Sequence, residues 1–176
     1  MRFSSDDLSS IANGQWNDGV VELGWLMARD APALHASDRD EEHRRRFELP
    51  LTHVPSLEHA LSIIAGWERA RAVGTLFALA VRLMSGETVG GCEVRPRDAS
   101  VVSLSYWTMP TYRGRGYCKR GVQLACAWLD GIKGLDTVEV LVASDNTASR
   151  HVAEACGFEQ AGTRDGNLLH VRRKIV

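Results

Sequence analysis

The spacing of apolar residues changes from a helical period to a strand period near the middle of the chain. From residue 57 to 71, apolar residues recur three and four positions apart behind Ser56, a good N-cap, which predicts a helix. Runs rich in β-branched residues then predict an antiparallel meander, after which helices and strands alternate. Together these patterns predict a mixed α/β sheet. The predicted strands are 20–27, 75–84, 88–95, 101–109, 137–143, 158–162 and 168–176, and further helices are predicted over 116–129 and 147–155.

Two segments near the N-terminus are polar. Residues 1–19 carry turn signals, and we expect them to form an appendage with a short helix near 6–12, ahead of one domain over 20–176. In the charged segment that follows, Ser37 with Asp40 three residues later resembles a capping box. Acidic residues precede basic ones there, an order that complements a helix dipole. This segment is either a solvated surface helix or a lid over a substrate cleft.

Length and composition fit one globular domain and narrow the range of partners. The chain has 176 residues and a net charge of −1, without the basic excess that is usual in nucleic-acid-binding proteins. No apolar stretch reaches the roughly 20 residues of a membrane-spanning helix. Asp6 and Asp7 stand where a signal peptide needs its apolar core, so we expect a cytoplasmic location. The four cysteines and six histidines lack metal-binding spacing, which predicts reduced thiols and no metal site.

The most informative segment joins a predicted strand to a predicted helix and reads YRGRGYCKRG over residues 112–121. A helix start offers unpaired N–H groups and the positive end of a dipole, and glycines admit an anion closely. With basic side chains around the turn, this predicts a phosphate cradle, with a plain glycine-rich connector as the alternative. A P-loop is absent, and a dinucleotide fingerprint would need glycine where Lys119 stands. A polyphosphate- or nucleic-acid-binding domain would use the same basic cluster, but the charge balance disfavours it.

A family resemblance extends beyond this loop. Arg113–Cys118 resembles the (Q/R)xxGx(G/A) pyrophosphate loop of the GNAT superfamily of acyl-CoA N-acyltransferases. Ser105–Pro110 resembles a GYWxxP strand end, Ser144–Arg150 an NxxS helix entry, and Ala155–Phe158 the xxGF that closes that helix. The resemblance covers about 20–176 and points to the branch with ribosomal-protein and other protein N-terminal alanine acetyltransferases. It implies a single α/β (α+β) domain whose mixed, mostly antiparallel sheet has splayed central strands and flanking helices.

The same resemblance implies an acetyltransferase that moves an acetyl group from acetyl-CoA directly to a primary amine, on a protein N-terminus or a small molecule. Backbone groups at the strand end and the Asn146 side chain would hold the pantetheine arm, and the loop N–H groups would hold the pyrophosphate. A basic side chain at position 113, 115, 119 or 120 would meet the 3′-phosphate. A homodimer is left open. The implied cofactor-binding residues are Trp107, Thr108, Met109, Arg113, Gly114, Arg115, Gly116, Tyr117, Cys118, Lys119 and Asn146.

The catalytic residues are harder to assign, because the chain departs from the family pattern. Many members carry a tyrosine general acid four residues before the Gly-Phe pair, where this chain has Ala153. We name Ser149 as the replacement near the thioester sulfur, with helix capping as its alternative role. Glu93 is our candidate general base through a water relay, with a surface or ion-paired carboxylate as the alternative. Cys118 replaces the last small residue of the loop, and its thiol is small enough to preserve the loop.

The resemblance implies a primary amine as acceptor, and the class of amine that can react depends on how strong a base the site provides. An α-amine is roughly 10–15% neutral at pH 7 and a lysine about 0.04%. The neutral, reactive form of an α-amine is therefore about 300-fold more abundant, and an α-amine needs that much less deprotonation by the site. The weak signal for a base therefore favours an α-amine or another acceptor of low pKa. His43, His53 and Trp67 are candidates for the lining of the acceptor cleft. A non-catalytic acyl-CoA-binding module, which keeps the loop but not the chemistry, is the alternative function.

Overall fold

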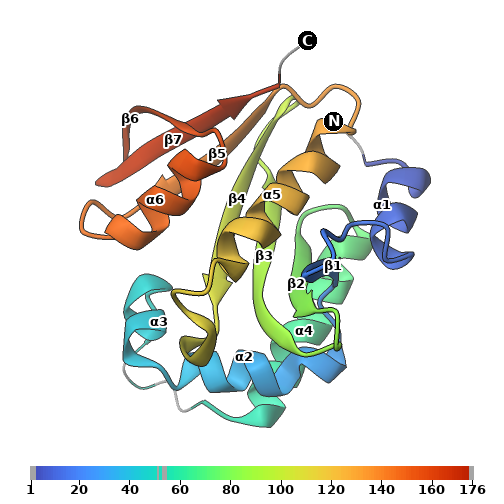
Figure 1. Ribbon diagram of the computed structural model, residues 1–176, viewed down its shortest axis with the longest axis vertical. Helices are drawn as coiled ribbons and strands as arrows, with labels where there is room; N and C mark the ends of the chain where they lie inside the picture. The colour runs from blue at the N-terminus through green and yellow to red at the C-terminus, as the bar shows by residue number, and fades with distance from the viewer. Residues whose placement is uncertain (1–2, 51, 53–54, 175–176) are drawn as a thin grey trace.

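One seven-stranded sheet runs through the protein, whose computed structural model describes residues 3–50, 52 and 55–174. Neighbouring strands are antiparallel, except that β4 and β5 are parallel. This arrangement confirms the predicted α/β domain with a mixed, mostly antiparallel sheet. The strands lie side by side in the order β1 (Val21–Trp25), β2 (Phe77–Leu83), β3 (Thr88–Pro96), β4 (Val101–Thr108), β5 (Thr137–Val142), β7 (Asn167–Arg173) and β6 (Glu159–Arg164) (Figure 1).

Helices cover both faces of the sheet (Figure 1). Phe77 and Leu79 of β2 face one helical layer, whereas Ala78 and Ala80 face the other, where small side chains allow close packing. The first layer holds α1 (Ser5–Ala12), α5 (Tyr117–Asp130) and α6 (Thr147–Ala155), and the second holds α2 (Ala31–Asp38), α3 (Glu41–Arg46) and α4 (Leu57–Ala72). Short 3-10 helices lie at η1 (Ala28–Asp30) and η2 (Pro110–Tyr112).

The central strands β4 and β5 diverge. They pair over three residues, from Val101 opposite Thr137 to Ser103 opposite Glu139. β4 then continues to Thr108 with no strand beside it on that side in the described part of the chain. This confirms the predicted splayed strands. The backbone groups on the free side of β4 are consequently open to a ligand that adds like another strand.

The charged segment forms two helices instead of the single helix predicted from Ser37. That residue lies in the last turn of α2, where its hydroxyl donates to the Ala33 carbonyl at 3.0 Å. α3 begins after Asp40, whose Oδ1 accepts from the His43 N–H at 2.8 Å. The predicted capping role of Ser37 is therefore wrong, and Asp40 is the N-cap.

The N-terminal residues pack against the sheet. The predicted short helix is present as α1, and its Ile11 is buried in the same core cluster as α5. The Trp128 indole N–H donates to the Asp7 carbonyl at 3.0 Å, and the Phe3 ring stacks on Trp128. These contacts join the N-terminal residues to α5, the helix that begins at the glycine-rich loop.

A buried ion pair fixes the end of the sheet near β1. Arg82, which is 2% exposed, donates to both carboxylate oxygens of Asp30 at 2.9 and 2.6 Å and to the Trp25 carbonyl at 2.7 Å. Thr88 donates to the same carboxylate at 2.6 Å. Burial alone would raise the pKa of Asp30, but these hydrogen bonds outweigh burial, and the pKa is lowered. Gly24 is required here because a Cβ would lie 2.7 Å from the guanidinium.

We expect Asp30→Ala to lower the free energy of unfolding by about 3–5 kcal/mol, because it leaves the Arg82 charge buried without a partner. Urea denaturation at pH 7 measures this, with Glu68→Ala on the exposed side of α4 as a control that changes stability by less than about 0.5 kcal/mol. Since folding lowers the pKa of Asp30, its contribution is complete above the unfolded value of about 3.9 and disappears as the pH falls through the folded value. A loss no larger than that of the control would contradict this account.

Candidate functional site

Two cavities meet at the gap between β4 and β5. The loop cavity has a volume of about 440 Å³ and lies against the glycine-rich loop. The strand cavity has a volume of about 620 Å³ and lies against β3, β4 and β5. The two cavities therefore adjoin at the gap. The residues that line both cavities are Arg46, Phe47, Tyr106, Asn146 and Ser149.

The glycine-rich loop leaves the start of α5 open. Gly116 is its N-cap with φ 78°, and Gly114 has φ 74°, both in the left-handed region that favours glycine. No side chain caps the helix. The first helical hydrogen bond runs from the Arg120 N–H to the Gly116 carbonyl at 3.2 Å, so the three N–H groups between them have no helical acceptor. Lys119 in this first turn opposes the helix dipole, and a bound anion would relieve that conflict.

Two of the four basic side chains at the loop have partners within the protein. Arg113 forms an ion pair with Asp40, the N-cap of α3, and lowers the pKa of that carboxyl group. Arg120 donates to Asp18 at 2.6 Å. Both were predicted as possible ligands of a phosphate, but the structure shows them bracing the loop against neighbouring segments.

Arg115 and Lys119 have no carboxylate partner among the residues described. The Arg115 guanidinium lies 5.5 Å from the centre of the Tyr112 ring, a cation–π contact that leaves its charge accessible. Lys119 lines the loop cavity. These two side chains are the basic groups of the loop best placed to meet an anion.

The end of β4 supplies the free backbone groups. The Met109 N–H donates to the Val89 carbonyl at 2.9 Å, and the Met109 carbonyl accepts from the Tyr112 N–H at 2.9 Å. Both backbone groups of Met109 thus have partners within the protein, and the prediction that Met109 offers backbone hydrogen bonds to a ligand stays a prediction. Because alternate residues of a strand direct their backbone groups to opposite sides, Trp107 shares the orientation of Met109 toward β3. Thr108 directs its groups toward the gap.

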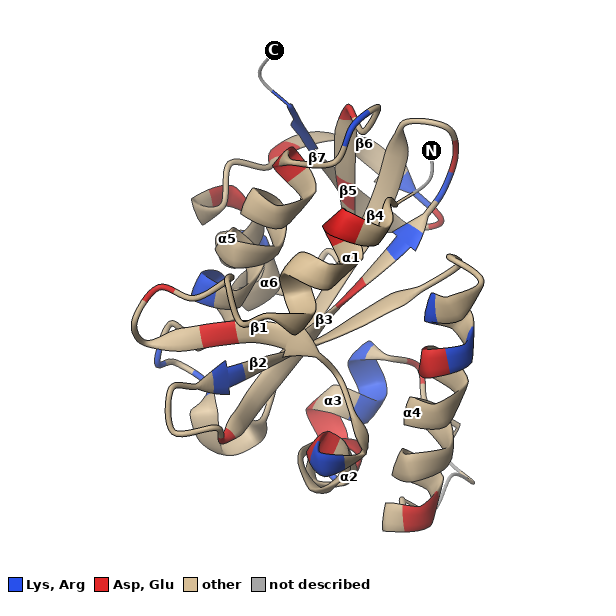
Figure 2. Ribbon diagram, turned by 90° about the vertical axis from the view of Figure 1, so that its right-hand side faces the viewer, with Lys and Arg blue, Asp and Glu red and all other residues tan. Residues whose placement is uncertain are grey.

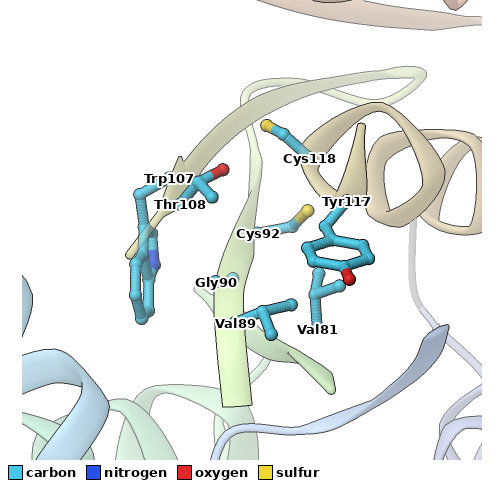
Figure 3. A pocket seen from close by; sticks show the side chains of 9 residues that line it. Val81, Val89, Gly90, Cys92, Trp107, Thr108, Tyr117 and Cys118 are labelled. Atoms are coloured by element: carbon cyan, nitrogen blue, oxygen red, sulfur yellow. The ribbon is translucent and has the colours of Figure 1, made fainter. Parts of the chain in front are cut away.

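Aromatic side chains fix the position of α3 over β4. Figure 3 shows Trp107 and Tyr117 on opposite sides of β3. The Trp107 indole lies over Gly91, where a Cβ would come within 2.7 Å of the indole nitrogen. His43 places its ring edge-on to Trp107, with centroids 5.9 Å apart, and stacks on Phe47. His43, which was predicted to line the acceptor cleft, lines the loop cavity and not the strand cavity.

Ion pairs tie α3 to the start of α6. Arg45 and Arg46 donate to the two carboxylate oxygens of Asp145 at 2.8 and 2.5 Å, and both arginines also pair with Glu42. Hydrogen bonds from Arg45 and then Arg46 lower the pKa of Asp145 to about 2. Figure 2 shows acidic and basic residues following one another along α3. Its position beside the junction of the two cavities favours the lid interpretation of this charged helix.

A hydroxyl pair crosses the gap where the cavities meet. Asn146 caps α6 by accepting from the Ser149 N–H at 3.1 Å. The Ser149 hydroxyl donates to the Tyr106 oxygen at 3.0 Å, and the Tyr106 hydroxyl donates to the Ser149 carbonyl at 2.8 Å. Burial raises the pKa of Tyr106, which stays protonated. Tyr106 was not predicted as a site residue, although the SYWTMP motif contains it. This tyrosine brings a phenol to the gap from β4, whereas Ala153 is fully buried in the core.

Glu93 is buried in the strand cavity and is not on the surface. Its side chain is 8% exposed and forms an ion pair with Arg95, and the cavity also contains Tyr106 and Ser149. The Glu93 Oε2 meets the guanidinium without the alignment of a hydrogen bond and accepts no other bond from the described residues. Burial raises the pKa of Glu93, while the charges of Arg95 and His43 oppose that rise. The carboxylate is therefore ion-paired within the lining of the strand cavity, with its Oε2 buried against the guanidinium.

Trp67 and Cys118 do not line the junction of the two cavities. Trp67 of α4 packs against the core and lines neither cavity, and His53 falls outside the described residues. Cys118 lines the loop cavity, but burial raises the pKa of its thiol, which disfavours a reactive thiolate. All four cysteines are free. Within the described ranges no cluster of side chains could hold a metal ion. None of the helices described here is long and apolar enough to cross a membrane.

Comparison with known proteins places this geometry in a family. Residues 14–159 match the acetyltransferase (GNAT) domain. No curated protein matches the chain in sequence. Among solved structures, Mycobacterium smegmatis RimJ in complex with a coenzyme A disulfide is 23% identical, covers 88% of this chain and 82% of its own, and has a TM-score of 0.73. RimL, a ribosomal α-N-protein acetyltransferase in complex with coenzyme A, is 16% identical over 89% and 95% of the two chains, with a TM-score of 0.76.

A third similar structure belongs to a self-immunity acetyltransferase. The microcin C7 self-immunity acetyltransferase MccE, in complex with acetyl-CoA and AMP, is 14% identical over 94% of this chain and 99% of its own, with a TM-score of 0.77. At these identities the structures support the fold, whereas the domain match covers most of the sequence. The chain therefore belongs to the GNAT acetyltransferase family and is an acyltransferase enzyme.

Proposed function

We propose that this enzyme transfers an acetyl group from acetyl-CoA to a primary amine, with an α-amine on a protein N-terminus or a small molecule as the favoured acceptor. One observation carries the proposal: the open start of α5 and the buried carboxylate of Glu93 lie in two cavities that meet at the diverging strands. Such a junction holds a donor and an acceptor in contact, and proximity of this kind is worth up to roughly 7–11 kcal/mol.

The residues of the loop cavity fit the cofactor. A Cβ at Gly114 or Gly116 would meet nothing within 4 Å, so an anion can approach the loop backbone closely. The unpaired N–H groups of α5 and the Lys119 ammonium suit a pyrophosphate. The free backbone groups of Thr108 suit an arm that contains amides, and Asn146 keeps its amide N–H donors for the same arm because its oxygen caps α6. Bound acetyl-CoA supplies the acetyl group as an activated thioester.

Side chains at the junction suit the proton transfers. Glu93 takes a proton from the acceptor ammonium, directly or through water, and burial raises its pKa in the direction that strengthens it as a base. Tyr106 orients the Ser149 hydroxyl, which donates to the Tyr106 oxygen in this structure and would turn its proton to the departing sulfur when the cofactor is bound. An α-amine suits this site better than a lysine, because a single buried carboxylate removes a proton more easily from an ammonium of lower pKa.

We expect free thiol to be released from acetyl-CoA when the protein is supplied with the right acceptor from a panel of N-terminal peptides, small α-amines and lysine-containing peptides. Mass spectrometry should locate the added acetyl group on an α-amine. Acetylation confined to lysine side chains would contradict the favoured acceptor class. Binding of acetyl-CoA without turnover on any of these amines would instead support the non-catalytic module.

Lys119→Gln is expected to weaken binding of coenzyme A by about tenfold or more, because a hydrogen bond between charged groups is worth about 1.5–3 kcal/mol. Arg120→Gln removes the same charge from the adjacent position, but Arg120 is bound to Asp18, so its effect should be less than about twofold. Titration calorimetry compares the two variants. Equal effects would show that the loop acts only through its overall charge.

Ser149→Ala is expected to lower kcat by about 100-fold and to leave the affinity for coenzyme A unchanged, since the hydroxyl acts on the leaving sulfur. Tyr106→Phe should cause a smaller loss of about tenfold, because it removes the group that orients Ser149. Steady-state kinetics with the acceptor found above test both, with exposed Ser144→Ala as the matched control. If Ser149→Ala retained the wild-type kcat, the Ser149 hydroxyl would serve only to join α6 to β4 through Tyr106.

A further inference from the structure

We propose that Arg95 is a positioning residue that keeps the Glu93 carboxylate ionised and directed into the strand cavity, ready to take a proton from the acceptor. This inference rests on the proposed function, in which Glu93 is the base. Arg95 was not among the residues singled out from the sequence, and the acetyltransferase family assignment does not give it a role.

The two side chains share one face of β3 because they stand two residues apart. Ser105 lies opposite Glu93 in the register of β3 and β4, and Ser103 lies opposite Arg95. These serines are small and line the floor of the strand cavity, so they leave the space above the ion pair open. The Glu93 side chain is 8% exposed and the Arg95 side chain 45%, so the carboxylate lies inside the cavity and the guanidinium lies toward its mouth.

A buried carboxylate without a counter-ion favours its protonated form, and a protonated Glu93 could not act as a base. Other charged groups also face the strand cavity, from the α3 region and from the loop before α6. Arg45 and Arg46 are both engaged by Asp145, and Glu48 is an exposed carboxylate at the lining of the same cavity. From α3, His43 also acts on Glu93 electrostatically. The cation in direct contact with the carboxylate is therefore Arg95.

The form of this ion pair also suits catalysis. Arg95 covers the buried Oε2 of Glu93, and no residue described here donates to Oε1, which leaves Oε1 for a donor that enters the strand cavity. An incoming ammonium can thus hydrogen-bond to Glu93 while Arg95 stays in place. When Glu93 takes the proton, the amine nitrogen keeps the electron pair with which it attacks the thioester carbonyl. The nitrogen then loses a second proton, and the departing sulfur takes that proton together with the electrons of the broken C–S bond, which releases free thiol.

The first test compares the pH dependence of kcat/KM in four forms of the full chain. Glu93 must be ionised to act, so Arg95→Gln should move the acidic limb to higher pH by about one unit or more, since a contacting arginine lowers a carboxyl pKa by 1–3 units. Arg95→Lys keeps the charge, so its acidic limb should lie close to that of the wild type. Arg97→Gln removes an exposed charge just beyond β3 and should leave the limb unchanged. The ionisation of the acceptor contributes equally to all forms, so differences between them report on the protein.

A second test does not depend on turnover. Carboxyl ¹³C NMR of protein labelled on glutamate follows the titration of Glu93 directly, with Glu93→Gln used to assign its signal. We expect the Glu93 midpoint to rise in Arg95→Gln and to stay in place in Arg97→Gln. An unchanged midpoint would overturn the role of Arg95, even if Glu93 proves to be the base. If Arg95→Gln raised only the acceptor KM, with both the pH limb and the midpoint unchanged, Arg95 would be a substrate contact and the proposal would fail.

If Glu93→Gln kept full activity and the wild-type acidic limb, Glu93 would not be the base, and the inference would fall with that part of the proposed function. If the wild-type protein showed no transfer at all, the NMR titration would still decide whether Arg95 keeps Glu93 ionised. The two failures are therefore distinguishable.

Discussion

The divergence of β4 and β5 after three paired residues is the constraint on which the site depends. Had the pairing continued, the backbone of Thr108 would be satisfied within the sheet, and no ligand could add to that edge. The gap also lets the start of α6 approach β4 closely enough for Ser149 to bond with Tyr106 at 3.0 Å. The loop cavity and the strand cavity meet at the same point. One topological feature thus provides an edge for binding, a passage between two ligands and a place for the hydroxyl pair.

α3 connects the groups around this gap by charge. Asp40 before its first residue holds Arg113 of the glycine-rich loop, and Arg45 and Arg46 in its last turn hold Asp145 before α6. Individual ion pairs at a surface contribute little, but here they join a short, polar helix to both sides of the junction. His43 adds the apolar contact, since its ring packs against Trp107. The position of α3 therefore depends on ionic contacts more than on a buried apolar face.

The sequence was sufficient for the features that depend on local spacing. The glycines at 114 and 116 predicted the open start of α5, and the β-branched run after residue 136 predicted β5. Contacts between distant positions were not predictable in this way. Asp40 and Arg113 are 73 positions apart, so nothing local showed that Arg113 was already paired. Tyr106 gains its role only because α6 folds back onto β4. Glu93 was named from its strand, but its burial and its pairing with Arg95 required the packed sheet.

The central claim is that the diverging strands form the channel in which donor and acceptor meet. A crystal structure of the protein grown with coenzyme A tests this most directly. The account predicts the pyrophosphate at the first turn of α5, the pantetheine arm along the free side of β4 beside Thr108, and the thiol near Ser149 and Tyr106. A cofactor bound elsewhere, or an arm lying outside the gap with β4 and β5 closed upon each other, would contradict it.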